Sequence, residues 1–387
     1  MILTIIDIIL IGILAISGFL YLVLIIEYTF NLRILLKRGG AVPDDNSITI
    51  SVIIAARNEE KQIKNILNDL VKQNYPNDKF EIIIIDDSSD DDTYNIVCNF
   101  INDNGSHAFQ LIKTEEKNKN VFGKKNALTK GIALAKGELI VQTDADCSVG
   151  PEWLSTIVEN YNQYKPKMMF GLVAYKNDKT IFAKLQHLEF LSLIASGAAA
   201  AYTKPIMCNG ANLIYESKAY QEVKALGIDE IYASGDDVFL LLRFKKHFGS
   251  ESIKVITDKN AIVYTQAKET LKEFINQRIR WASKSKGYKD WDIIKVSLIV
   301  FAYNIGLLLT LMLSVIFCSL FSLFLIFFIL KIIIDMPVLY IICKHIQRRD
   351  LLKYYILLQI LYLPYLCFTA IAGFTSKYSW KGRRIVS

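Results

Sequence analysis

The sequence lacks the cysteine patterns that build disulfide frameworks and zinc sites. Its six cysteines are scattered over 387 residues without a Cys-x-x-Cys or Cys-x-His spacing, and three of them lie in the apolar C-terminal part. Disulfide-rich domains and zinc modules both depend on regularly spaced cysteines. We therefore expect the chain to fold without disulfides or structural zinc.

Other signals are missing as well. The sequence contains no internal repeat, no low-complexity tract and no nucleic-acid-binding motif, although its formal net charge is +7. The basic residues gather beside apolar segments, so anionic membrane lipids explain them more simply than nucleic acid does. The N-terminal apolar stretch has neither the basic start nor the small-residue cleavage site of a signal peptide.

Hydrophobic residues make up 52% of the chain and are concentrated at its two ends. Residues 5–28 carry only two charges, Asp7 and Glu27, and are long enough for a membrane span of about 20 residues. Basic residues follow this stretch: Arg33, Lys37 and Arg38. By the positive-inside rule, residues 1–28 are a retained membrane anchor and the next segment is cytosolic.

The C-terminal part is predicted to hold about three more membrane segments within residues 294–376. Residues 296–340 are too long for one span, so we expect two helices with a turn near residues 318–322, and a last span at residues 356–374. The basic tail at residues 377–387 then falls outside the cell, against the positive-inside rule. A re-entrant last segment or another division of the helices stays open.

Asp335 is a charged residue inside the second of these apolar runs. Such a residue is by default a functional candidate. Because Met336 and Pro337 follow it, we interpret it instead as a sign that a helix ends nearby.

Strands and helices alternate in residues 47–265, which is typical of an α/β domain with a mostly parallel sheet. Residues 51–56, 81–86 and 138–143 are largely apolar without alternation, as expected of strands covered on both faces. Each of the three is followed by a polar turn. Because ligands bind outside the carboxyl ends of strands in such sheets, we expect the three turns to meet at one pocket.

The third turn offers two carboxylates, Asp144 and Asp146, separated by one residue. Hard oxygen ligands suit Mg²⁺ or Mn²⁺, and the alternative is an aspartate-rich turn that only caps the next helix. In the second turn, Asp86 and Asp87 stand at the strand end, where a ligand would be, whereas residues 90–93 are typical of helix capping.

Two further motifs stand at helix starts. Lys124 belongs to a Gly-Lys-Lys-Asn sequence whose amides and lysines suit a phosphate, the alternative being a solvated basic helix start. Asp236 and Asp237 follow Ser234 and Gly235 and precede an apolar run. Helix capping explains one of these aspartates but not both.

An amphipathic segment at residues 266–293 precedes the C-terminal spans. At about 100° per helical residue, Gln277, Arg280 and Trp281 fall on one side of a helix. A largely different, apolar stripe contains Leu271, Phe274, Ile275 and Ala282. Such a helix can lie on the inner membrane face, with its stripe in the headgroup boundary and its polar groups aimed at one target. The alternative is an ordinary interfacial helix.

In order and spacing, these motifs resemble those of the inverting family 2 nucleotide-sugar glycosyltransferases. That group includes cellulose, chitin, hyaluronan and poly-N-acetylglucosamine synthases and ceramide glucosyltransferase. The resemblance covers residues 51–281 and the flanking membrane architecture. It implies a GT-A-type, Rossmann-like fold with a mostly parallel sheet, in a cytosolic domain inserted between transmembrane helices. The chain would then be a multi-pass integral protein of the cell membrane.

The resemblance also implies which residues bind the donor. They are Arg57, Glu59, Asp86, Asp87, Lys124, Asp144 and Arg280. Asp86 and Asp87 match the turn that holds uracil, and Lys124, three residues before an Ala-Leu pair, matches the lysine that contacts the diphosphate. Asp144 and Asp146 match the family's Asp-x-Asp, which holds Mg²⁺ or Mn²⁺.

Acceptor-side roles follow from the same resemblance. Asp236 and Asp237 match the acidic catalytic dyad, with Asp237 as the base, and Gln277 and Trp281 match the acceptor-binding positions of Gln-x-x-Arg-Trp. One departure concerns residues 216–218, where Glu-Ser-Lys stands in place of an arginine that the family often has near the acceptor. This departure leaves the acceptor open.

The expected function is transfer of a sugar from a UDP-sugar to a polysaccharide or lipid-linked acceptor. Addition of a single sugar to a membrane lipid is the alternative, because about four spans give a narrow passage for a growing polymer unless an oligomer or partner widens it. A membrane protein that binds a nucleotide-sugar without turnover would usually have lost its aspartates, and all are present here. The sugar and the number of additions stay open.

Overall fold

The computed structural model describes residues 5–37, 47–105, 107–114, 123–176, 178–226, 236–375, 378–380 and 383–385. The chain forms two compact units. We call them the sheet unit, which comprises Leu35–Asp178, Ala201–Ala267 and Ser379–Ser387, and the helical unit, which comprises Met1–Ile34, Lys179–Ala200 and Lys268–Tyr378. Each is described by itself.

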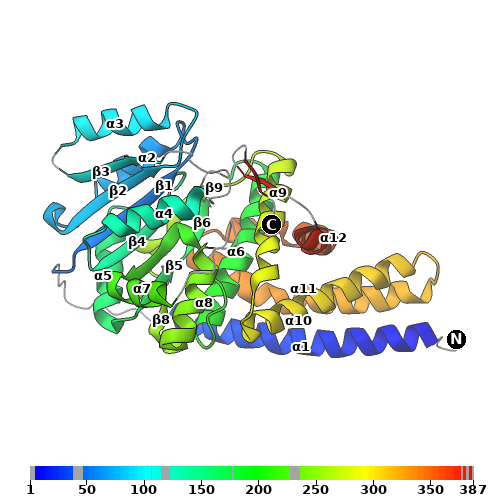
Figure 1. Ribbon diagram of the computed structural model, residues 1–387. Coiled ribbons are helices and arrows are strands. Elements are labelled where there is room, and N and C mark those ends of the chain that lie inside the picture. The colour runs from blue at the N-terminus through cyan, green and yellow to red at the C-terminus, as the bar shows by residue number, and fades with distance from the viewer. Residues whose placement is uncertain are drawn as a thin grey trace. The chain divides into compact units, whose positions relative to one another are not determined.

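A seven-stranded sheet in the order β3-β2-β1-β4-β7-β5-β8 forms the centre of the described sheet unit (Figure 1). The first four strands run parallel: β3 (Ala108–Lys113), β2 (Phe80–Asp86), β1 (Ile50–Ala56) and β4 (Leu139–Asp144). The next, β7 (Leu213–Glu216), is antiparallel to both β4 and β5 (Met168–Gly171), and β5 pairs in parallel with β8 (Ile253–Ile256). Strands β6 (Val173–Lys176) and β9 (Val263–Gln266) form a separate parallel pair.

Helices cover this sheet on its faces (Figure 1). They are α2 (Ile63–Leu70), α3 (Thr93–Asp103), α4 (Gly123–Leu134), α5 (Trp153–Tyr164), α7 (Ser217–Ala225) and α8 (Asp236–Phe248). Short 3-10 turns complete the described unit: η1 (Asn77–Lys79), η2 (Gly210–Asn212), η3 (Ser250–Ser252) and η4 (Lys259–Ala261). Helix α4 packs so closely on the sheet that a Cβ on Gly131 would lie 2.4 Å from Cδ1 of Ile85. The runs of isoleucine and valine in β1 and β2 are buried because both faces are covered.

The predicted α/β fold with a mostly parallel sheet is confirmed. Predicted strands at residues 51–56, 81–86 and 138–143 each agree with an observed strand to within one residue at either end. The antiparallel insertion of β7 between β4 and β5 was not predicted, because strand direction depends on pairing partners that local pattern does not reveal.

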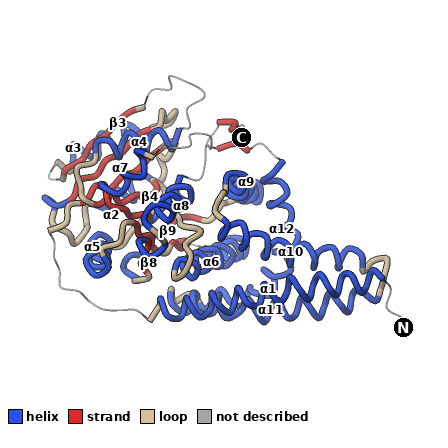
Figure 2. Tube along the Cα trace, turned by 60° about the horizontal axis from the view of Figure 1, so that its bottom comes forward, coloured by secondary structure: helices blue, strands red, loops and turns tan. Residues whose placement is uncertain are grey.

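Long helices dominate the helical unit (Figure 2). They are α1 (Ile5–Leu35), α6 (Ile181–Ala201), α9 (Leu271–Ser283), α10 (Trp291–Leu313), α11 (Ser319–His345) and α12 (Tyr355–Thr375), with the turns η5 (Lys284–Gly287) and η6 (Arg349–Tyr354). Strands β10 (Tyr378–Trp380) and β11 (Arg383–Ile385) form a two-stranded sheet at the C-terminal end, which apart from Tyr378 belongs to the sheet unit. Among the described residues, four helices are by length and composition able to cross a membrane: α1, α10, α11 and α12 with its preceding turn.

Helices α1 and α10 meet through glycines (Figures 1 and 2). A Cβ on Gly18 would lie 3.0 Å from the Tyr303 ring, and one on Gly306 would lie 3.2 Å from Cδ2 of Leu14. Small residues at helix contacts let backbones approach closely, which is how helices associate in a membrane.

Asp335 does not mark a helix end, and the predicted turn at residues 318–322 lies earlier. Helix α11 begins at Ser319 and continues past Pro337 to His345. The Asp335 carboxylate accepts hydrogen bonds from Tyr21 (2.7 Å), Lys331 (2.6 Å) and Gln359 (3.0 Å), and the Lys331 side chain is fully buried. Paired in this way, the charge is compatible with a continuous apolar helix.

Candidate functional site

The three predicted turns do meet at one edge of the sheet. Strands β2, β1 and β4 are parallel neighbours, with Ala56 opposite Asp86 and Ala55 opposite Asp144. The strands therefore end at nearly the same level, and the turns that follow them lie side by side.

Arg57, the first residue after β1, has its side chain 7% exposed and turned toward the β2 turn. Its Nη1 donates to the carbonyl oxygens of Asp87 (2.7 Å) and Ser88 (2.6 Å), and its Nη2 lies 3.2 Å from Asp90. Arg57 was expected to contact a donor. In the structure its guanidinium holds the backbone of the turn that contains Asp87.

The two turns also hold each other through hydrogen bonds between backbone amides and side-chain oxygens. Asn58 and Ser88 both adopt positive φ, 51° and 54°, which non-glycine residues rarely do. Asn58 donates its amide to Ser89 and accepts from the amide of Asp90. Glu59, also expected to contact the donor, is half-buried and donates its amide to Thr93 (2.8 Å).

Asp86 and Asp87 are buried at this edge, with 1% and 4% of their surfaces exposed. One Asp86 oxygen accepts from the amide of Ser89, while its Oδ1 meets no hydrogen-bond donor among the described residues. Asp87 accepts from the Thr114 hydroxyl. A buried carboxylate oxygen without a donor is costly, so Asp86 is suited to receive an N–H group of a ligand.

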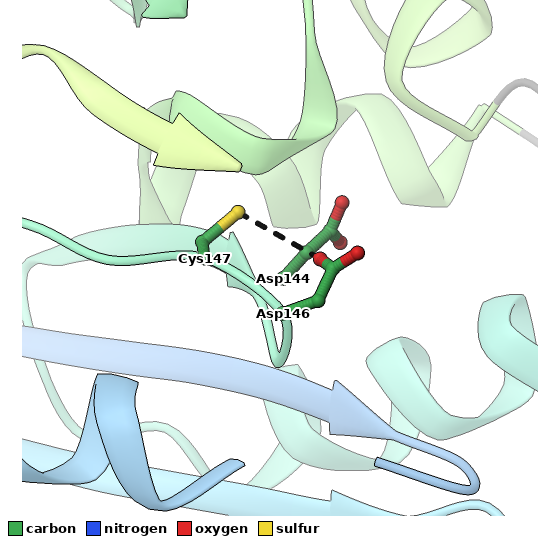
Figure 3. Close-up of side chains that lie close together, drawn as sticks. All are labelled: Asp144, Asp146 and Cys147. Atoms are coloured by element: carbon green, nitrogen blue, oxygen red, sulfur yellow. Dashed lines mark hydrogen bonds between the residues drawn. The ribbon is translucent and has the colours of Figure 1, made fainter. Parts of the chain in front are cut away.

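Figure 3 shows Asp144, the last residue of β4, with Asp146 and Cys147 of the turn that follows, and both carboxylates point to the same side. One ligand atom from each residue lies within 4.8 Å of the others. The amine of Lys124, at the start of α4, is 2.5 Å from Oδ1 of Asp144, as an ion pair that is about one-third exposed. The sequence-predicted lysine and Asp-x-Asp motif are thus brought together.

Cys147 is buried beside the two carboxylates. The thiol contacts Oδ1 of Asp146 at 3.9 Å (Figure 3), and burial, with the charges of Asp146 and Asp144, raises the pKa of the Cys147 thiol well above its usual range. The oxygens of the two carboxylates are hard donors of the kind that fit Mg²⁺ or Mn²⁺.

Asp237, near the start of α8, reaches the same end of β4. Its Oδ2 accepts from the amide of Gly210 (3.1 Å), and its Oδ1 from the amide of Val238 (2.8 Å). A Cβ on Gly210 would lie 3.3 Å from the side chain of Gln142, which precedes Asp144 by two residues on β4. Asp236 opens α8, but its side chain, like residues 234–235, lies outside the described part of the chain.

The departure at residues 216–218 lies away from this site. Glu216 is opposite Leu139, at the amino end of β4, because β7 runs antiparallel. Its carboxylate pairs with Lys167 (2.6 Å) and accepts from Tyr161 (2.9 Å). The residue therefore stabilises the opposite edge of the sheet.

The Gln-x-x-Arg-Trp segment lies on α9 of the helical unit. Gln277 accepts from Nη1 of Arg278 at 2.5 Å, and the Arg278 guanidinium lies 4.3 Å from the centre of the Trp281 ring. Arg280 and Trp281 are half-buried. Arg278 was missed by the sequence analysis. The only feature of the sequence that could have pointed to Arg278 is a charged residue at one of the two variable positions of Gln-x-x-Arg-Trp.

The apolar stripe predicted to enter the headgroup boundary is largely covered by protein. Phe274 is 7% exposed and packs on Tyr365 and Phe182, with ring centres 5.4 and 5.8 Å away. A Cβ on Gly373 of α12 would lie 2.7 Å from Cβ of Ala282. Packing of α9 on α12 therefore occupies this stripe, although Leu271 is exposed.

Comparison with known proteins points in one direction. A family model described as glycosyl transferase family 2 matches residues 51–223, and one described as glycosyl transferase family group 2 matches residues 139–374.

Two relatives are each 27% identical to the chain. One is a dolichyl N-acetyl-alpha-D-glucosaminyl phosphate 3-beta-D-2,3-diacetamido-2,3-dideoxy-beta-D-glucuronosyltransferase of Methanococcus voltae, with 67% of this chain and 85% of that protein matched. The other is a poly-beta-1,6-N-acetyl-D-glucosamine synthase of Staphylococcus epidermidis, with 69% of this chain but only 61% of that protein matched.

A solved structure shares the fold. It is a mannosyltransferase from Pyrobaculum calidifontis in complex with GDP-Man and Mn²⁺, with a TM-score of 0.60, 17% identity, and 94% of this chain and 99% of that chain covered. At this identity the likeness concerns the fold alone.

Replacing Asp146 with Asn should weaken Mn²⁺ binding at least about tenfold, because one of two hard oxygen donors becomes a neutral amide. Stability should change by no more than about 0.5 kcal/mol, since Asp146 is half-buried in a turn. Calorimetric titration of the full chain with Mn²⁺, with a melting curve, measures both. Asp103→Asn, at the exposed end of α3, is the control. Equal Mn²⁺ affinity in both variants would contradict the assignment.

Proposed function

Because the chain belongs to glycosyl transferase family 2, we propose that it transfers a sugar from a UDP-sugar to a polysaccharide or lipid-linked acceptor, with inversion at the anomeric carbon. The proposal depends on one observation above all. The carboxylates of the β2 and β4 turns, the Lys124 amine and the Asp237 carboxylate gather at the carboxyl edge of one sheet.

The donor base would be received by the β2 turn. Asp86 has a buried oxygen without a donor, and the N–H of uracil would satisfy it. Arg57 keeps this turn in place by binding its backbone carbonyls, so its contribution to donor binding is indirect. Lys124 lies beside Asp144, where its positive charge would meet the diphosphate.

Asp237 is the proposed base. The amides of Gly210 and Val238 hold its carboxylate in one orientation, so that it can accept the proton of the acceptor hydroxyl. The acceptor oxygen then forms a bond to the anomeric carbon while the bond to the diphosphate breaks on the opposite side. Lys124 and Arg280 would stabilise the charge that develops on the leaving diphosphate. Mg²⁺ or Mn²⁺ held by Asp144 and Asp146 would supply further neutralisation of that charge.

The acceptor would be recognised by Gln277 and Trp281, whose amide and indole lie together on α9 through Arg278. The names of the two relatives favour different acceptors, a dolichyl-linked sugar and a growing polysaccharide. The chain spans most of the first relative but only 61% of the second. Addition of one sugar to a lipid-linked acceptor is therefore the second candidate.

We further propose that α1, α10, α11 and α12 cross the membrane and that the sheet unit lies in the cytosol. Ser319, at the start of α11, donates to Asp7 near the start of α1 (3.3 Å), so these two helix starts lie on the same side. The basic residues after α1 assign that side to the outside.

Asp237→Asn should lower sugar transfer by about 10²- to 10⁴-fold and leave UDP affinity unchanged, because the amide cannot take a proton. Transfer from radiolabelled UDP-N-acetylglucosamine to the membrane fraction, tested beside other UDP- and GDP-sugars, measures the first effect. Calorimetry with UDP and Mn²⁺ measures the second. Near-normal transfer would exclude Asp237 as the base. If the parent did not bind UDP, the proposal that the donor is a UDP-sugar would be wrong.

Trp281→Ala should raise the concentration of membrane extract that gives half-maximal transfer about tenfold, because an aromatic surface for the acceptor sugar is lost. Arg280→Lys should instead lower the maximal rate, because an ammonium cannot reproduce a planar fork on a diphosphate. Kinetics with a titrated membrane extract separate the two. If both variants showed the kinetics of the parent, α9 would have no role in transfer and would be an ordinary interfacial helix.

Cys318, exposed in the turn between α10 and α11, should react with a membrane-impermeant maleimide in intact cells. A cysteine introduced at the exposed Lys72 of the sheet unit should react only after permeabilisation. Cys147 and Cys208 are buried and would stay unreactive on either side, so they are unsuitable probes. If the introduced cysteine were labelled in intact cells, the sheet unit would lie outside the cell and the proposed topology would be wrong.

A further inference from the structure

Helix α6 carries polar side chains that are buried among apolar neighbours. Gln186, His187 and Glu189 are 2%, 1% and 3% exposed. Gln186 and Glu189 are three residues apart and so lie on the same face of the helix. Buried polar groups are costly unless they are paired, so their partners show what this face holds.

Gln186 holds the chain just before α9. Its amide nitrogen donates to the carbonyl of Lys268 (2.9 Å), and its amide oxygen accepts from the amide of the same residue (3.0 Å). Two residues later, Thr270 begins α9 through a capping box with Glu273. The start of α9 is thereby anchored to α6.

Glu189 holds the middle of α9. Its carboxylate forms a two-point ion pair with Arg278, through Nε at 3.2 Å and through Nη2, and the two side chains are 4% and 3% exposed. Tyr365 of α12 donates a third hydrogen bond to Glu189 (3.0 Å). Charges buried this deeply require such saturated pairing, because an unpaired one would be strongly destabilising.

Arg278 passes this constraint on to both proposed acceptor-binding residues. Its guanidinium lies over the rings of Phe274 (4.5 Å) and Trp281 (4.3 Å), which fixes the indole by a cation–π contact. Its Nη1 donates to Oε1 of Gln277 (2.5 Å). Because the amide oxygen of Gln277 is engaged in this way, its amide nitrogen is the group left to donate to a ligand.

We propose that Glu189 and Arg278 are positioning residues that set the orientation of Gln277 and Trp281 for the acceptor, and that Gln277 acts there as a hydrogen-bond donor to an acceptor hydroxyl. The proposal rests on the proposed function, in which Gln277 and Trp281 contact the acceptor. Neither Glu189 nor Arg278 touches the reacting atoms. They act by holding the amide and the indole in one geometry, as bidentate pairing of a planar fork permits.

The test uses the full chain in membranes, with radiolabelled UDP-N-acetylglucosamine and a titrated membrane extract as acceptor source. Arg278→Lys keeps a positive charge beside Glu189 but loses the fork, so it should fold and yet show a roughly 10- to 100-fold fall in transfer at low extract concentration. The loss should lie in the concentration of extract needed for half-maximal transfer rather than in the maximal rate. UDP affinity should stay as in the parent.

A double variant separates positioning from stability. Glu189→Gln alone leaves Arg278 buried and unpaired and should lower the melting temperature, whereas Glu189→Gln with Arg278→Met removes both charges and should restore it. Transfer by the double variant should nevertheless stay low, because Gln277 and Trp281 have lost their shared partner. Asp335→Asn, which breaks another buried ion pair among the described residues of the helical unit, is the matched control. It should lower stability but leave the extract concentration for half-maximal transfer as in the parent.

The outcomes are distinct. Transfer like the parent in Arg278→Lys, or in a folded double variant, overturns the positioning role while Trp281→Ala still raises the extract requirement. If Trp281→Ala and the parent behave alike, the proposed function of the segment fails instead. An equal loss in Asp335→Asn would show a general effect of destabilising the helices and would also overturn the inference.

Discussion

Parallel hydrogen bonding between β2, β1 and β4 is the constraint on which the candidate site depends. The register pairs Ala56 with Asp86 and Ala55 with Asp144, so that three turns separated by long stretches of chain end at one level. The isoleucine and valine side chains of β1 and β2 are buried on both faces of the sheet, so a shift of either strand along its neighbours would move its polar end residues toward this apolar region. The same burial that stabilises the sheet thus aligns the polar turns.

Three buried charged side chains also restrict how the chain can move, and each has a different kind of partner. Arg57 donates to backbone carbonyls, Lys331 is paired with Asp335 among apolar helices, and Glu189 is paired with the Arg278 fork. Such groups tolerate little movement, because losing a partner leaves a charge away from water. Two of the three lie next to residues of the proposed donor and acceptor machinery. Rigidity is therefore concentrated where geometry matters for transfer.

Family membership explains the chemistry better than it explains the acceptor. In the proposed function, the carboxylates of Asp144 and Asp146, the Asp237 base and Lys124 all serve the transfer of a sugar from its nucleotide. The proposed recognition of the acceptor depends instead on side chains of α9 and on the helices that hold it. The relatives accordingly combine similar sequences with names that describe different acceptors.

Much of the fold, and the meeting of the acidic turns at one edge of the sheet, followed from the sequence by itself. Apolar runs defined three buried strands to within one residue and indicated the long helices, because burial on both faces and membrane-length hydrophobicity are local properties of the chain. The acidic turns followed from strand ends, since a parallel sheet gathers them at one edge.

Only the tertiary structure decided how charged residues are used. Arg57 supports a turn, Glu216 lies at the opposite edge, Asp335 is paired within a continuous helix, and Arg278 joins Gln277 to Trp281. In each case the partner comes from a distant segment, and hydrophobic periodicity carries no information about which buried charge will meet which. Pairing across the fold, rather than local pattern, determines the role of these residues.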